Sequence, residues 1–97
     1  MMLTGKQKRF LRSLAHQLDP VFQVGKNGVG EEMIGQINDC LEARELIKVS
    51  ILQNCGDDKQ SVAAKIAEGT DAEIVQIIGN IIVLYKESKE NKQIVLP

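Results

Sequence analysis

The 97-residue sequence predicts a single α/β domain of the α+β type, with elements in the order α-β-α-β-α-β-β. Three observations lead to this fold class. The chain is long enough to bury one core without metal or disulfide crosslinks, apolar residues at helical spacing alternate with short β-prone runs, and Gly79-Asn80 separates two apolar runs as in a tight hairpin. We therefore expect one domain over residues 1–97, in which helices pack on a four-stranded mixed sheet.

The first predicted helix, residues 4–18, has an apolar stripe and a cationic face. Thr4 can cap its beginning, and Asp19-Pro20 ends it. On a helical wheel the large apolar side chains fall together, namely Leu3, Phe10, Leu11, Leu14 and Leu18. The opposite side carries no carboxylate and is formed by Lys6, Lys8, Arg9, Arg12, Ser13 and His16. A helix that only needs solubility normally mixes charges, so this face favours a polyanionic partner, although a charged outer face is often merely solvated.

The middle of the chain predicts a strand–helix–strand unit. A β-prone run at 21–24 precedes a helix at 31–44, in which apolar residues recur at helical spacing. An alternating run at 45–53 predicts the second strand, on which Lys48 should face solvent. Such a unit should form a right-handed crossover, which makes its two strands parallel.

The last third predicts a helix and a hairpin. Asp57 or Asp58 can cap the third helix, which should reach residue 68. Strands at 73–78 and 81–86 follow, and the short turn between them makes them antiparallel. The charged tail from about residue 87 should fray, although the apolar residues near its end can dock.

The stretch VFQVGKNGVG places a G-x-x-G loop, Gly25 to Gly28, between the first strand and the second helix. It lacks the lysine and hydroxyl spacing of a P-loop and the spacing of a dinucleotide-binding loop. A loop of this form clamps the nucleic-acid backbone in KH domains. Glycines let phosphates approach the main chain, Lys26 adds a charge, and Asn27 adds a donor. The alternative is a plain turn, and Glu31 and Glu32 would weaken the positive potential of the following helix.

Charge is distributed unevenly along the chain. The net charge is −1, but residues 1–30 carry five basic side chains and one acidic one, whereas residues 31–97 carry seven basic and twelve acidic ones. Such a polarised chain can recruit a polyanion locally. If the first strand returns antiparallel to the first helix, the loop should lie level with Lys8 and Arg9 and form one cationic strip with them. Lys86 is a candidate extension of this strip.

Several functional classes are disfavoured. Cys40, Cys55 and His16 lack the spacing of a zinc site, and the two cysteines are expected to be reduced thiols. No signal peptide and no run long enough for a membrane span is recognised, so we expect a cytoplasmic protein without a membrane partner. No catalytic constellation, cofactor motif, metal site or small-molecule substrate site stands out. Aromatic residues make up only 3% of the chain, which disfavours recognition of bases by stacked rings.

Three separated blocks of the sequence stand out, namely LTGKQKRFLRSLAHQLDPVFQVGKNGVG, ELIKVSI and VQIIGNIIVLYK. Together they resemble the YhbY-like family of single-domain CRM proteins (chloroplast RNA splicing and ribosome maturation). The resemblance runs from about residue 3 to 86. It implies an RNA-binding domain similar to the C-terminal domain of translation initiation factor three, association with precursors of the large ribosomal subunit, and no enzymatic activity. By position, it implies RNA contacts from Gly25, Lys26, Asn27, Gly28, Lys6, Lys8, Arg9 and Arg12. Lys86 stands where an arginine is common, and Gly30 replaces a capping Ser or Thr.

The leading hypothesis is therefore an RNA-binding protein that contacts ribosomal RNA through the G-x-x-G loop and the basic first helix and assists assembly of the large ribosomal subunit. The alternative is an adaptor whose acidic surface docks a basic partner, such as a ribosomal protein. A nucleotide-using enzyme is disfavoured because the chain has neither a phosphate-loop lysine nor metal ligands at motif spacing.

Overall fold

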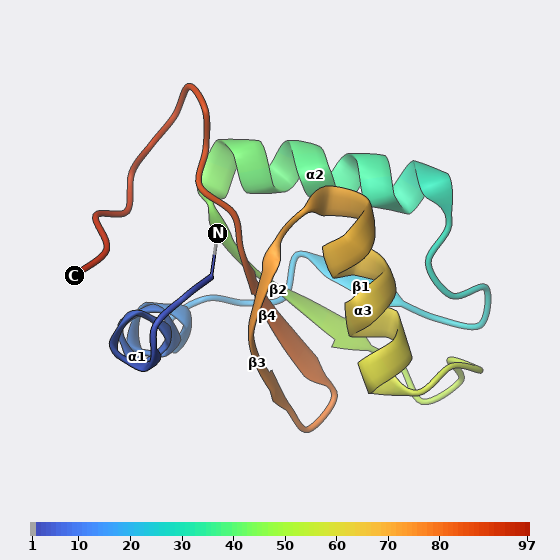
Figure 1. The fold of residues 1–97 in the computed structure, drawn as a ribbon. Helices are drawn as coiled ribbons and strands as arrows, with labels where there is room; N and C mark the ends of the chain where they lie inside the picture. Colours follow the sequence, from blue (N-terminus) through green and yellow to red (C-terminus); the bar gives the residue numbers. More distant parts are fainter. Residues whose placement is uncertain (1) are drawn as a thin grey trace.

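In the computed structural model, which describes residues 2–97, the helices and strands follow the predicted order (Figure 1). They are α1 (Gly5–Ala15), β1 (Phe22–Val24), α2 (Glu31–Arg44), β2 (Leu46–Ile51), α3 (Lys59–Thr70), β3 (Glu73–Ile78) and β4 (Ile81–Tyr85). The first helix is shorter than predicted and ends at Ala15 instead of Leu18. Asp58 caps α3, as one of the two predicted candidates, since its carboxylate accepts the N–H of Ser61 at 2.7 Å.

The four strands form one mixed sheet in the order β1-β2-β4-β3. β1 and β2 are parallel, while β4 is antiparallel to both of its neighbours, as predicted. Alternation along β2 sends Ile47, Val49 and Ile51 to one face of the sheet and Leu46 and Lys48 to the other. The fold class predicted from the sequence is confirmed.

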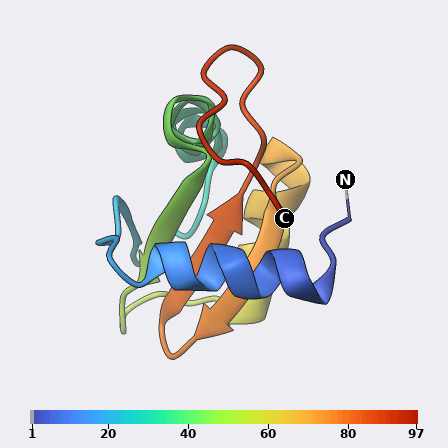
Figure 2. The same ribbon diagram turned by 90° about the vertical axis from the view of Figure 1, so that its left-hand side faces the viewer.

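Helices cover both faces of this sheet. α2 and α3 pack on one face, around a core that includes Ile37, Val49 and Ile66. α1 alone packs on the other face, where Leu11 and Ala15 meet side chains of β2, β4 and β3, namely Leu46, Val83, Tyr85 and Val75. Figure 2 shows α1 crossing in front of the strands, with α2 and α3 behind them.

The buried stripe of α1 differs in part from the predicted one. Leu3 and Leu11 are buried as expected, but Leu14 is 39% exposed and Phe10 only half-buried. Ala15, one helical turn after Leu11, is buried with it against the sheet. Its small side chain lets the helix lie close to the sheet. The beginning of the helix is a capping box: Thr4 Oγ1 accepts the N–H of Gln7 at 3.1 Å, and Gln7 Oε1 accepts the N–H of Thr4 at 3.0 Å.

The C-terminal tail, for which the sequence predicts fraying, is held against the domain by two carboxylates. Glu45 has a positive φ of 67° and is completely buried; it accepts the backbone N–H groups of Ser88, Gln93 and Ile94 at 2.7–2.8 Å. Glu42 accepts the hydroxyl of Ser88 at 2.6 Å and further tail N–H groups. Ile94 and Leu96 pack beside α1, as the apolar character of the tail end suggests. The acceptors lie more than 40 residues upstream, so local composition could not reveal them.

Glu45 should make the stability of the domain depend on pH in the acid range. Burial raises the pKa of its carboxyl, but the N–H groups of Ser88, Gln93 and Ile94 outweigh burial, and the pKa lies below its ordinary value of 4.5. Because the folded state therefore binds fewer protons than the unfolded state, stability is full above about pH 4.5 and falls below it. Glu45→Gln should lower the free energy of unfolding at neutral pH by about 2 kcal/mol. The difference from wild type should shrink in acid, as urea titrations at several pH values can measure.

The exposed Glu68 on α3 provides a matched control. Glu68→Gln should change the free energy of unfolding by less than about 0.5 kcal/mol at neutral pH. If Glu45→Gln proved as stable as wild type, or if its deficit stayed constant down to strongly acid pH, the ionised carboxylate would not hold the tail.

Candidate nucleic-acid interface

The G-x-x-G loop forms a tight turn between β1 and α2. The N–H of Gly28 donates to the carbonyl of Gly25 at 3.0 Å, and Gly28 has a φ of +66°. This backbone conformation favours glycine over other residues. The two residues at the tip, Lys26 and Asn27, are both exposed. The loop therefore presents one cation and one amide to solvent on a backbone held by its own hydrogen bond.

The loop lies beside the β2–α3 connection. A Cβ atom placed on Gly25 would lie 3.5 Å from Leu52 and 3.6 Å from Asn54, and one placed on Gly28 would lie 3.2 Å from a carboxylate oxygen of Asp57. The same oxygen of Asp57 is 3.4 Å from Nζ of Lys65. A negative charge thus lies next to the loop, together with a lysine that partly offsets it.

The start of α2 adds only modest positive potential to this region. Gly30 is the N-cap residue and provides no side-chain hydrogen bond to the first turn, while Glu31 and Glu32 occupy that turn. Their carboxylates already complement the helix dipole, as the sequence suggested. The lysine at the tip is therefore the main source of positive charge in the loop.

The outer face of α1 is the second basic feature. Lys6 and Arg9 are exposed, whereas Lys8 and Arg12 are half-buried along the helix. His16 follows at the end of the helix and is exposed. No acidic residue occurs within α1, so no carboxylate of the helix itself offsets these charges.

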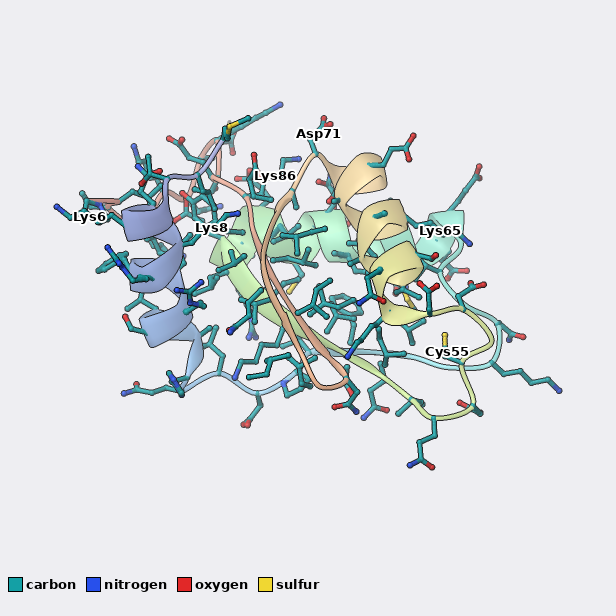
Figure 3. The ribbon with its side chains drawn as sticks, turned by 60° about the horizontal axis from the view of Figure 1, so that its bottom comes forward. Lys6, Lys8, Cys55, Lys65, Asp71 and Lys86 are labelled. Atoms are coloured by element: carbon teal, nitrogen blue, oxygen red, sulfur yellow. The ribbon has the colours of Figure 1, made fainter. Side chains whose placement is uncertain are left out.

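The predicted proximity of the loop to this helix is wrong. Figures 1 and 3 show α1 and the loop that follows β1 at opposite sides of the molecule; Lys6 and Lys8 lie away from Cys55, whose segment adjoins the loop. The prediction assumed that β1 returns antiparallel to α1. Instead, α1 crosses the strands because its buried side chains meet β2, β4 and β3 together, and β1 leads away from it. The two basic features are separate sites.

Lys86 does not join them either. It follows β4, and its Nζ donates to Oδ1 of Asn38 on α2 at 2.8 Å. This places it on the α2 side of the sheet, in a hollow that it shares with Asp39, Glu42 and Glu90. Carboxylates surround this lysine, in contrast to the lysines of α1.

The prediction that Lys48 faces solvent is wrong, and this residue is a further candidate. It is half-buried on the face of the sheet that α1 covers, and its Nζ donates to the carbonyl of Leu18 at 3.0 Å. Together with Arg12 and His16 it lines a groove of about 310 Å³ between α1 and the β3–β4 hairpin. Strict alternation in ELIKVSI puts Lys48 on the same face as Leu46, which is the signal that could have found it.

Within residues 2–97, no group of three or more His, Cys, Asp or Glu side chains could hold a metal ion. Among the helices described, none is long and apolar enough to cross a membrane.

The fold and the loop together define a class of small α+β modules in which a G-x-x-G turn joins the first strand to the second helix. The family model of the CRS1 / YhbY (CRM) domain matches residues 3–86, and the chain belongs to this family. This confirms the resemblance seen in the three sequence blocks.

Individual relatives agree over nearly the whole chain. The chain is 69% identical over 96 residues to "Probable RNA-binding protein YqeI" of Bacillus subtilis, covering 99% of this chain and 100% of the relative. It is 44% identical over 90 residues to "RNA-binding protein" of Haemophilus influenzae, covering 93% and 91%. The solution structure of the hypothetical protein SAV1595 from Staphylococcus aureus superimposes with a TM-score of 0.81 at 64% identity, covering 99% and 100% of the two chains.

The loop geometry predicts different effects of substitution at two of its glycines. Gly28→Ala should lower the free energy of unfolding by about 1 kcal/mol, because an L-residue is strained at this positive φ and its Cβ would press on Asp57. Gly30 has a φ of −106° and open space around it, so Gly30→Ser can supply the missing cap and should raise stability by a few tenths of a kcal/mol. Urea unfolding measures both. Equal stability of Gly28→Ala and wild type would contradict the described turn.

Proposed function

We propose that the protein binds RNA through phosphate contacts at two separate sites, the G-x-x-G loop with Lys26 and the outer face of α1. The observation that carries this proposal is the outer face of α1, where Lys6, Lys8, Arg9 and Arg12 stand without any acidic residue in the helix. An unbalanced cationic face of this kind favours a polyanion. The names of the relatives from B. subtilis and H. influenzae, both of which include RNA binding, support the same partner.

The separation of the two basic features supports an RNA of defined three-dimensional structure. The molecule measures 37 × 26 × 22 Å, and α1 and the loop lie at opposite sides of it. An RNA that contacts both must extend across the domain or fold around it. We therefore propose a structured RNA as the target. The resemblance to the YhbY-like family further implies ribosomal RNA and assistance to large-subunit assembly, which we propose takes place in the cytoplasm by binding alone and without catalysis.

The adaptor alternative has less support. It requires the acidic part of the chain to present free carboxylates to a basic partner. Two of its twelve acidic side chains, Glu42 and Glu45, accept hydrogen bonds from the tail of the same chain, and the names of the relatives point to RNA. Copurification of a basic protein that persists after ribonuclease treatment would favour this alternative.

The two-site proposal predicts how affinity depends on salt. Lys26→Ala and Arg9→Ala should each weaken binding to a large ribosomal RNA fragment and lower the slope of log K against log salt by about one, since each removes one phosphate contact. Because the two residues lie on separate elements, their effects should add in the double variant. Filter binding at several salt concentrations measures the slopes.

The control for these variants is Lys92→Ala in the tail, where Lys92 pairs with Glu87 at 3.1 Å. Its salt slope should equal that of wild type. A short RNA hairpin that can reach only one site should respond to only one of the two variants. Unchanged slopes for Lys26→Ala on every RNA tested would remove the loop from the interface.

Asp57 should oppose binding at the loop, because its carboxylate lies beside Gly28 and pairs with Lys65. Asp57→Asn removes this charge and leaves Lys65 free to attract phosphate. Affinity for the ribosomal RNA fragment at low salt should rise about two- to fourfold, the range of one exposed charge interaction.

Asp71 provides the matched control for this variant. It caps the far end of α3 in a left-handed conformation that asparagine also adopts readily (Figure 3). Asp71→Asn should therefore leave both fold and affinity unchanged. If the two variants raised affinity equally, the effect would reflect net charge alone, and Asp57 would have no special place in the interface.

A further inference from the structure

The groove beside α1 exists because this helix covers only part of its face of the sheet. Leu11 and Ala15 lie over Leu46, Val83 and neighbouring side chains. The end of the β3–β4 hairpin extends past the helix, as Figure 2 shows. Two cross-strand rows face this uncovered region: Lys48, Val83 and Gln76 form one row, and Ile81 and Ile78 belong to the next.

The floor and the rim of the groove differ in chemistry. Its floor and outer wall are aliphatic, formed by Ala15, Val83, Ile81 and Ile78, and Ile78 is 58% exposed. The amide of Gln76 is the one uncharged polar side chain among the residues that line it. The rim carries Arg12, His16 and Lys48, and no carboxylate lines the groove. Lys48 is held in place by the carbonyl of Leu18, which uses one of its three donors and leaves two for a ligand.

We propose that this groove binds a single unstacked nucleotide of the RNA, with the sugar and base against the aliphatic floor and the phosphate on the basic rim. The inference rests on the proposed RNA-binding function and adds a specificity for unpaired segments. A volume of about 310 Å³ suits one nucleotide, whereas a duplex is too wide to enter it. Basic side chains without a neighbouring carboxylate complement the negative charge of a phosphodiester. The amide of Gln76 can donate a hydrogen bond to a base edge or accept one from it.

The chemistry of the floor also defines how bases are discriminated. No aromatic ring lines the groove, so a base would meet methyl and methylene groups instead of a stacking partner. Such contacts are tolerant of base identity, because each base presents a flat apolar face. The groove therefore selects unpaired over paired RNA, with little preference among sequences.

The test compares a single-stranded oligouridylate of about eight nucleotides with an RNA hairpin, each measured by fluorescence anisotropy against the full-length protein. Ile78→Glu places a carboxylate on the exposed wall, and Lys48→Met removes a rim cation but keeps the apolar stem. Each variant should bind the oligouridylate about tenfold more weakly and the hairpin as wild type does. Ala64→Glu, an exposed position on α3, adds the same charge elsewhere and should leave both affinities unchanged. Circular dichroism establishes that the variants fold.

Each outcome decides between the inferences. Selective loss of oligouridylate binding, with amide shifts in NMR titrations at Ala15, Gln76 and Ile81, supports the groove. Unchanged oligouridylate binding, or equal loss of both RNAs, overturns the groove and leaves the proposed function standing. If wild type did not bind the oligouridylate, the groove would be overturned; if it also failed to bind the large ribosomal RNA fragment, the proposed function itself would fail. Poly-glutamate tests a different ligand. If it displaced the oligouridylate, and if the same variants weakened poly-glutamate binding more than oligouridylate binding, the groove would bind an acidic peptide, and the inference would be overturned.

Discussion

In this protein, a single helix packs on one face of the sheet. α2 and α3 share the other face, so α1 must contact β2, β4 and β3 at once, and it can do so only by crossing them. Burial of apolar surface is the main favourable term in folding, and the crossing lets one short helix bury side chains of all three strands. The orientation of α1 follows from this requirement, and so do the placement of its charges and the extent of sheet left open.

The consequence for recognition is that positive charge is divided between two sides of the domain. The G-x-x-G loop, with the exposed Lys26 at its tip, lies beside the β2–α3 connection, whereas α1 with its cations packs on the face of the sheet opposite α2 and α3. The acidic residues all lie outside α1, and two of the carboxylates, Glu42 and Glu45, serve as internal acceptors for the tail. In nucleic-acid recognition generally, phosphate contacts orient the ligand, while base edges and shape supply selectivity.

Local patterns predicted most of the fold. Periodicity, the Thr4 and Asp58 caps and the Gly79-Asn80 turn gave the correct order of helices and strands, and parallel pairing of the first two strands followed from the crossover. The predictions that failed concern contacts between residues far apart in the sequence. The angle between α1 and β1 depends on which strands the helix must cover, and the docking of the tail depends on Glu45, a carboxylate 43 residues before Ser88. The candidate residues of the loop and of α1 were identified from sequence, but their separation and the contribution of Lys48 required coordinates.

The docked tail also has a practical implication for how the protein is handled. The carbonyl of Pro97 accepts a hydrogen bond from the side chain of Gln7 at 3.3 Å, so the last residue lies against the first turn of α1. Any affinity tag or fused domain attached there would emerge next to Lys6 and Lys8 and could screen them. If the protein were immobilised through that end in a biosensor, a ligand in solution would reach the loop side of the molecule more readily than α1.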